Sequence, residues 1–403
     1  MIFNRKKNRN VPLFVSIGAG EQQLPLIVEA HGQGFKVVGV DRNPRAPGAA
    51  FCDIKIQESI DNHREIIDKL REVSIYGDIQ GVLTKSYGKA VRSACHVARE
   101  MGISMIPPGR VDDFIDKRKM KRVFSRNGIP SPGFETITAA ALSRNKQKIP
   151  YPAVIKPLSG HGKKDVRLLR SPAEMDRFLS RSVHRSFLLE EYVSADEVIA
   201  AGIVFRGTYH LVSVSDKVTS PAPYFVDLLH LYPSRYAGLE NRITRIGQQV
   251  ASAFEIDLSP LIMEILVTED GDLLLIEAAP EFGGEYIPDI LVPRGTGYNL
   301  LGEAVRAATG GKFSPPGKPE QRSAVAIKYI TGKNGVIASY NRGAADLIPG
   351  IVLSRIFLEP GTSVKRPVNN HDRIGVIAAA ARTPEEARSL AEKAEEALSI
   401  VIK

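Results

Sequence analysis

The first hundred residues alternate short apolar runs with amphipathic helical segments, and this alternation limits the fold more than any other feature of the chain. In chain order the segments are LFVSIGAG, a helical pattern near residues 22–34, KVVGVD, HREIIDKLREV, IQGVLTK and KAVRSACHVAREMG. Apolar strands that alternate with helices predict a parallel sheet with helices on both faces. We therefore expect residues 12–115 to form a doubly wound, Rossmann-like α/β domain.

The end of the first predicted strand carries Gly18 and Gly20, which resemble part of a dinucleotide-binding fingerprint. That fingerprint needs a third glycine, which is missing here. Two glycines before a helix also serve as a plain tight turn, and we favour that interpretation.

Beyond residue 115 the strict alternation ends, and hairpin-like strands with glycine turns replace it. This pattern is typical of an α+β arrangement, which we assign to residues 116–314, with a smaller subdomain at about 131–190. The sequence PPGKPE at 315–320 has the composition of a linker. Residues 320–403 then predict a small C-terminal α+β domain.

The charge of the chain argues against nucleic acid as a partner. The formal net charge is +9, and NRKKNRN supplies four of the cations within a segment, residues 1–11, that we interpret as a mobile basic tail. Aromatic residues make up only 7% of the chain, and no basic stretch is interleaved with aromatics that could stack on bases. A basic excess equally suits an anionic small substrate.

The cysteines and the apolar runs bear on location. Cys52 and Cys95 are the only cysteines and have no metal-ligand spacing, which favours a reducing cytoplasm. The run VPLFVSIGAG is short and leads into a glycine turn, so we interpret it as a strand rather than a signal peptide. No apolar run approaches the roughly 20 residues that a membrane span needs.

Two glutamates in the stretch LIMEILVTEDGDLLLIEAAPEFGG raise a question of charge. Asp270-Gly271 is a strong signal for a two-residue hairpin turn, which would pair Glu264 with Glu277. Like charges directly opposite each other destabilise a sheet. The pair is tolerated if one carboxylate takes a proton or if a cation such as Mg²⁺ lies between the two, held partly by nucleotide phosphates. An edge hairpin with both glutamates in water is the bland alternative.

The segments that precede the hairpin carry further polar signals. YPAVIKP delivers Lys156 at the end of an apolar strand, immediately before the glycine-containing run LSGHGKKD, an arrangement that can hold phosphate. FLLEEYVSADEV is another apolar strand that runs into acidic residues, and DKRKMKRVFSRNGIPSPGF is a basic helix with a sharp stop. Each signal alone is also compatible with a solvated surface.

Taken in order, these segments resemble the ATP-grasp superfamily, in its carboxylate–amine ligase branch, and the resemblance covers residues 12–400. It implies a central ATP-grasp module of two subdomains that binds ATP, with Glu264 and Glu277 holding Mg²⁺, and with Mn²⁺ as an alternative metal. By the same resemblance, Lys117 and Lys156 would contact ATP phosphates, and Glu197 the ribose. The remaining expected ATP contacts are a lid loop of Ser159, Gly160, His161 and Gly162 and a hinge of Glu190, Tyr192 and Val193 beside the adenine.

The chain departs from the superfamily after the second glutamate. Many members read Glu-x-Asn-Pro-Arg there, whereas this chain reads EAAPEF, with Ala279 in place of the asparagine and Glu281 in place of the arginine. Arg294 could restore the lost cation from the next segment. Alternatively, Glu281 could pair with a substrate amine, or the enzyme could be inactive.

The resemblance implies an ATP-dependent ligase that activates a carboxylate as an acyl phosphate and couples it to an amine, releasing ADP and phosphate. His230, before Pro233 and Ser234, resembles a substrate-side histidine of amino-acid ligases, and His230 or Glu281 could assist deprotonation of the amine. The alternatives are a bicarbonate-using carboxylase and a nucleotide-binding protein without catalysis. We expect small-molecule carboxylate and amine partners, a homodimer, no membrane and no nucleic acid.

Overall fold

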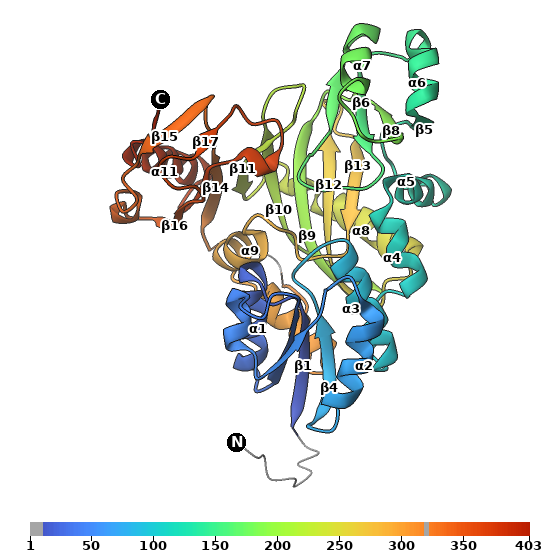
Figure 1. Cartoon of the computed structure of the whole chain (residues 1–403), viewed down its shortest axis with the longest axis vertical. Helices are drawn as coiled ribbons and strands as arrows, with labels where there is room; N and C mark the ends of the chain where they lie inside the picture. Colours follow the sequence, from blue (N-terminus) through green and yellow to red (C-terminus); the bar gives the residue numbers. More distant parts are fainter. Residues whose placement is uncertain (1–10, 318–321) are drawn as a thin grey trace.

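The structure is a computed structural model that describes residues 11–317 and 322–403 (Figure 1). The predicted basic tail, except residue 11, and residues 318–320 of the predicted linker lie outside these ranges. The N-terminal part of the chain lies at the bottom of Figure 1, a tall central sheet lies above it, and the C-terminal part lies to one side. No helix within the described ranges is long and apolar enough to cross a membrane.

The N-terminal part is the predicted α/β domain. Its sheet has the order β3-β2-β1-β4, with every neighbouring pair parallel. Helix α1 lies on one side of the sheet and α2 and α3 lie on the other (Figure 1). Strand β3 was not predicted, because its sequence IKIQ is only four residues long and lacks an apolar run. The bounds are β1 Pro12–Ile17, α1 Leu24–Gly32, β2 Lys36–Asp41, β3 Ile54–Gln57, α2 His63–Val73, β4 Asp78–Leu83 and α3 Lys89–Glu100.

A separate four-stranded antiparallel sheet, which we call the lid, follows the helices α4 (Pro108–Ile115) and α5 (Lys117–Arg126). Its strand order is β5-β8-β6-β7, and α6 and α7 pack on it. Eight buried side chains, among them Leu142 and Met175, form a hydrophobic core that is distinct from the core of the rest of the chain. The bounds are β5 Phe134–Thr138, α6 Ala139–Asn145, β6 Ala153–Pro157, β7 Arg167–Leu169, α7 Pro172–Leu179 and β8 Ser186–Glu191.

The central sheet has eight strands in the order β13-β12-β9-β10-β11-β14-β18-β16, and it joins the central and C-terminal parts of the chain. All seven neighbouring pairs are antiparallel. The predicted boundary near residue 320 therefore falls within one continuous sheet, although the C-terminal strands add a small core of their own. The strands are β9 Asp196–Phe205, β10 Thr208–Thr219, β11 Asp227–Tyr232, β12 Leu258–Val267, β13 Leu273–Ala279, β14 Ala324–Ile330, β16 Ile351–Ile356 and β18 Gly375–Ala381.

The remaining elements cover this sheet or complete its edges. Helix α11 packs on β14 and β18, and α8 packs on β10. The bounds are α8 Glu240–Ala253, α9 Val292–Thr296, α10 Leu300–Ala308, β15 Gly335–Ser339, β17 Ser363–Val364, α11 Pro384–Ala397, β19 Val401–Ile402 and the short turns η5 Ile287–Leu291 and η7 Asn370–Asp372.

The hairpin of β12 and β13 pairs Glu264 with Glu277, as predicted, but its turn differs from the prediction. The loop has three residues, 269–271, closed by the Thr268 N–H, which donates to the Asp272 carbonyl, and Gly271 has a φ of +80°. A glycine in this left-handed region is typical of three-residue hairpin loops. Near the loop Ile265 pairs with Leu275, so Ile276 is an extra residue that forms a β-bulge, and the bulge restores the predicted pairing.

Candidate active site

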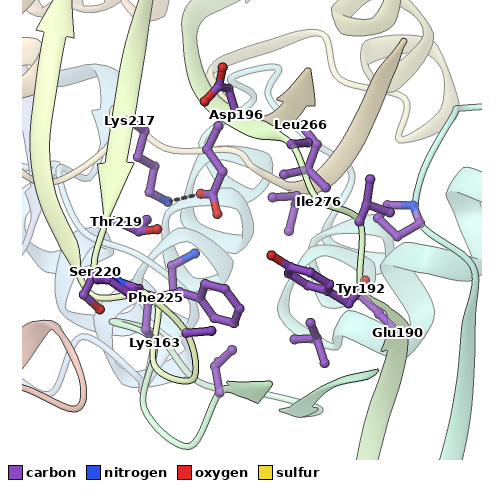
Figure 2. Close-up of a pocket in the computed structure, with 18 of the residues that line it drawn as sticks. Lys163, Glu190, Tyr192, Asp196, Lys217, Thr219, Ser220, Phe225, Leu266 and Ile276 are labelled. Carbon is purple, nitrogen blue, oxygen red and sulfur yellow. Dashed lines mark ion pairs between the residues drawn. The ribbon is translucent and has the colours of Figure 1, made fainter. Parts of the chain in front are cut away.

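A cavity of about 370 Å³ lies between the lid and the central sheet. Figure 2 shows Lys217, Thr219 and Ser220 on one side of this cavity and Tyr192, Leu266 and Ile276 on the other. Tyr192 and Phe225 present their rings to each other, with ring centroids 6.4 Å apart and an interplanar angle of 27° (Figure 2). Apolar walls with a few convergent charged groups are typical of a small-molecule site.

The predicted ATP contacts fall into two groups. One group, Lys156, Glu190, Tyr192, Val193 and Glu197, lines the cavity. The other group, Lys117, Ser159, Gly160, His161 and Gly162, lies outside the cavity wall, although Lys163, which follows the second group in the chain, lines it. Half of the predicted nucleotide contacts therefore share this cavity, and the role of all ten in binding ATP stays a prediction.

Glu190 lies at the edge of the cavity and is only 3% exposed. Lys121 pairs with its Oε1 at 2.8 Å, and Lys156 pairs with its Oε2. Burial alone would raise the pKa of Glu190, but the two ammonium groups outweigh burial and hold the pKa at about 2. The carboxylate of the predicted hinge residue is thus occupied by two lysines, and only its backbone stays available for a base.

The two glutamates of the hairpin are neutralised separately by lysines from other segments. Lys117, the first residue of α5, pairs with Glu277 at 2.6 Å. Glu264 pairs with Lys163 at 3.1 Å and with Lys217 at 2.9 Å. Burial would raise the pKa of Glu264, but these two ammonium groups hold it well below its ordinary value. Protein cations therefore resolve the repulsion between the paired strands in this structure.

Lys217, on strand β10, was not predicted as a site residue. Its side chain is 1% exposed and contacts three carboxylates, those of Glu197, Asp227 and Glu264, at 3.2, 3.2 and 2.9 Å. Glu197, the predicted ribose contact, thus has its carboxylate engaged by a lysine. No local signal marked Lys217, because β10 has the mixed sequence TYHLVSVSDKVT, in which a lysine is equally compatible with a solvated strand end.

Glu281 follows β13 and is partly buried beside the two paired glutamates. Burial and the charges of Glu277 and Glu264 raise its pKa to about 8, and Lys117 offsets this only in part. Within the described ranges its side chain makes no ion pair. Arg294, predicted to restore the missing cation, is exposed on α9 and makes no contact with these carboxylates in the same ranges, so its role stays a prediction.

His230 is 1% exposed and lies in a second polar cluster, between β11 and the C-terminal part of the chain. Its Nε2 lies 2.6 Å from Oε2 of Glu285, and Arg373 pairs with the other oxygen of Glu285 at 2.7 Å. Burial would raise the pKa of Glu285, but His230 and Arg373 hold it at about 2. The Arg373 guanidinium also lies 3.7 Å from the ring centroid of Tyr329. Glu285 and Arg373 were not predicted as site residues.

The donor set of the hairpin fits a hard divalent cation only in part. Within residues 11–317 and 322–403, no group of three or more histidine, cysteine or acidic side chains is arranged to hold a metal. Glu264 and Glu277 offer two carboxylates, which is the protein share that Mg²⁺ usually takes when phosphates supply further oxygens. The residues therefore fit a metal that arrives with a nucleotide and do not form a complete metal site by themselves.

Two models of protein families match parts of the chain. Residues 149–289 match a family model described as ATP-grasp domain, and residues 328–403 match one described as L-amino acid ligase C-terminal domain 2. The chain is 27% identical over 338 residues to the uncharacterized protein y4rH of Sinorhizobium fredii, covering 80% of this chain and 68% of that protein. It is 25% identical over 284 residues to the N5-carboxyaminoimidazole ribonucleotide synthase of Bacillus subtilis, covering 68% of this chain and 71% of that protein.

The fold is also shared with a solved structure. The L-amino acid ligase from Bacillus licheniformis superposes with a TM-score of 0.82 at 19% sequence identity, covering 98% of this chain and 100% of that chain.

Proposed function

We propose that this chain, which carries an ATP-grasp domain and an L-amino acid ligase C-terminal domain, is an ATP-dependent ligase that joins a carboxylate to an amine. The observation that carries the proposal is the pairing of five lysines with the carboxylates of Glu190, Glu264 and Glu277, a cluster of which Lys156, Lys163, Lys217 and Glu190 line the cavity. The reaction forms an acyl phosphate from the substrate carboxylate and ATP, releasing ADP, and the amine then displaces phosphate to give an amide or peptide bond.

The lysine–carboxylate pairs suit a site that receives a highly charged nucleotide. Lys117, Lys156 and Lys163 each neutralise a glutamate in the structure, and each would exchange that carboxylate for phosphate oxygens when ATP binds. The exchange keeps every cation neutralised and avoids the cost of leaving a charge buried and unpaired. Tyr192 and Phe225 would enclose the base, and the backbone of Glu190 and Val193 would contact its edge.

Glu264 and Glu277, released from their lysines, would hold Mg²⁺ or Mn²⁺. When bound, the metal would neutralise charge on the phosphates and polarise the transferred phosphoryl group. The chain's own residues position the reactants and exclude water, and phosphoryl transfer needs no protein nucleophile. We assign His230 and Glu281 to the amine side, where a carboxylate or imidazole can take the proton that the amine loses. His230, whose Nε2 lies next to Glu285, would act beside the amine.

The proposal includes finer points that rest on the sequence. Both cysteines are free and buried, which supports a cytoplasmic location. A homodimer stays a prediction that light scattering would test.

The test is ADP release from Mg·ATP with pooled amino acids, followed with and without magnesium. We expect release to depend on both additions, and Glu277→Gln to lower kcat by about 100-fold or more, because metal stabilisation of transferred charge is worth several kcal/mol. Glu269→Gln, in the loop of the same hairpin and exposed, is the matched control and should leave kcat unchanged.

Other outcomes would redirect the proposal. Incorporation of labelled bicarbonate in place of amide formation would identify a carboxylase. Tight ATP binding without any turnover would identify a nucleotide-binding protein without catalysis.

A further inference from the structure

A turn of the C-terminal part, residues 369–373, reaches the site and holds Asn370 in a fixed orientation. Asn370 is 9% exposed. Its side-chain Nδ2 donates to the carboxylates of Asp227 at 2.6 Å and Glu285 at 3.3 Å, and its Oδ1 accepts from the Asp227 N–H at 3.0 Å. Both ends of the amide group are therefore satisfied, and flipping it would oppose like partners.

The same turn contacts the loop of residues 158–166, which connects β6 and β7 of the lid. We call this whole loop the lid loop, and it includes residues 159–162, which were predicted as a lid loop. The Asn370 N–H donates to the Gly162 carbonyl at 2.9 Å. Gly162 has a φ of +64°, and a Cβ added there would lie 2.9 Å from Nε2 of His371. The His161 ring packs between Tyr87 of the N-terminal part, at 4.2 Å, and His371, at 5.4 Å between ring centroids. The lid loop thus rests against two other parts of the chain.

Asn370 thereby connects to Glu264 by two independent routes. On one route, its backbone holds Gly162, and the next residue, Lys163, pairs with Glu264. On the other route, its side chain holds Asp227, which pairs with Lys217, and Lys217 also pairs with Glu264. The contacts form a closed ring through Glu264, Lys163, Gly162, Asn370, Asp227 and Lys217.

We propose that Asn370 is a positioning residue that docks the lid loop onto the C-terminal part and so holds Lys163 and Lys217 beside Glu264, from where Lys163 can move to the phosphates when ATP binds. Docking and alignment of the lysines are then coupled, because the backbone N–H that holds Gly162 and the side chain that holds Asp227 belong to the same residue. An undocked lid loop leaves Lys163 free and lets water reach the phosphates. The C-terminal turn is in this sense part of the nucleotide site, although it lines no part of the cavity.

The first experiment measures docking without any substrate. Trypsin cleaves after lysine, and Lys163 and the exposed Lys164 lie in the lid loop. We expect Asn370→Ala in the full chain to speed trypsin cleavage after these lysines by roughly 10-fold, because cleavage follows the population of the open loop. Asn334→Ala is the matched control, since Asn334 belongs to the same part of the chain and its amide accepts from the Arg366 N–H instead. Alanine keeps the backbone N–H that holds Gly162, so faster cleavage would come from loss of the side-chain contacts that fix the turn. An unchanged cleavage rate in Asn370→Ala would overturn the role of the Asn370 side chain in docking.

The second experiment, which rests on the proposed function, measures the chemistry. Asn370→Ala should lower kcat by about 10- to 100-fold with less than a threefold change in KM for ATP, because small misplacements of aligned groups cost rate more than binding. It should also raise the phosphate released per amide formed. A changed KM with an unchanged kcat would overturn the positioning role. If the unmodified chain has no ligase activity while Asn370→Ala still speeds cleavage, the proposed function is overturned and the docking role of Asn370 stands.

A second variant covers the case in which Asn370→Ala fails to fold. Gly162→Ala attacks the same contact from the lid loop, where the substitution meets His371 and a left-handed backbone. It should speed cleavage and lower kcat in the same direction as Asn370→Ala. Faster cleavage with an unchanged kcat would show that docking has no part in aligning the lysines.

Discussion

The lid and the C-terminal part both border the site, but they are attached to the molecule in different ways. The lid has its own four-stranded sheet and its own hydrophobic core. The C-terminal part instead contributes β14, β18 and β16 to the central eight-stranded sheet. Backbone hydrogen bonds of a continuous sheet fix the C-terminal part to the central strands, whereas the lid has no such ladder to them within the described residues. The eight-stranded sheet, with its C-terminal strands, is therefore a fixed border of the site, which we call the platform. The lid is the other border, and it is able to move relative to the platform.

Charged residues of the site follow the same division. Glu264, Glu277 and Lys217 lie on strands of the platform, whereas Lys156 and Lys163 come from the lid. The pair between Lys163 and Glu264 therefore forms or breaks as the lid moves, whereas the pair between Lys156 and Glu190 lies within the lid sheet and moves with it. Pairs such as that of Lys217 with Asp227 belong to the platform and persist.

The largest effect should come from Lys217, because its charge holds the platform together. Within the described residues, Lys217→Met leaves Glu197 and Asp227 without an ion-pair partner and Glu264 with Lys163 alone, which should lower the free energy of unfolding by about 3–5 kcal/mol. Urea denaturation measures the loss. Lys328→Met is the matched control on β14 of the same sheet: Lys328 pairs with Glu395 at 2.7 Å, both are partly exposed, and the loss should stay below about 1 kcal/mol. Equal losses in the two variants would contradict the platform role of Lys217.

A pair of leucines tests whether the lid is an independent unit. Leu142 lies in the lid core and Leu398 in the C-terminal core, and both are fully buried. Each change to alanine should cost about 3 kcal/mol locally, because it leaves a cavity. Hydrogen exchange should show loss of protection confined to the lid in Leu142→Ala, but spread through the central sheet in Leu398→Ala. Loss of protection across both regions in Leu142→Ala would remove the distinction.

The smallest effect concerns Glu281, a carboxylate that no cation pairs among residues 11–317 and 322–403. Its pKa of about 8 lies above the unfolded value, so the folded chain keeps this proton while the unfolded chain loses it. Stability contributed by the group is present at low pH and is lost as pH rises through about 8. Glu281→Gln should therefore stabilise the chain by roughly 1–3 kcal/mol at pH 9 and hardly at all at pH 5. Thermal unfolding at the two pH values measures this, and a difference independent of pH would contradict it.

The sequence predicted the fold class and the hairpin of Glu264 and Glu277, but it did not predict the partners that distant segments contribute. The pairing of Glu264 with Glu277 was predicted because a strand's alternation and a glycine turn are local signals. The predicted two-residue turn was wrong, and the bulge at Ile276 compensated for the error. Lys217, Glu285 and Asn370 were missed because their partners lie up to 143 residues away along the chain, as with Asn370 and Asp227. No local pattern marks such contacts.

The bulge at Ile276 has one more consequence, for changes in chain length. Leu266 and Ile276 line the cavity, and Glu277, the residue after Ile276, lies opposite Glu264 and pairs with Lys117. Ile276 supplies apolar surface and Glu277 supplies charge. Adding or deleting a residue in the loop at 269–271 would alter only an exposed turn. The same change beside Ile276 would shift the register of β13, so that either Ile276 would leave the cavity or Glu277 would no longer lie opposite Glu264. In this strand the count of residues is as restricted as their chemistry.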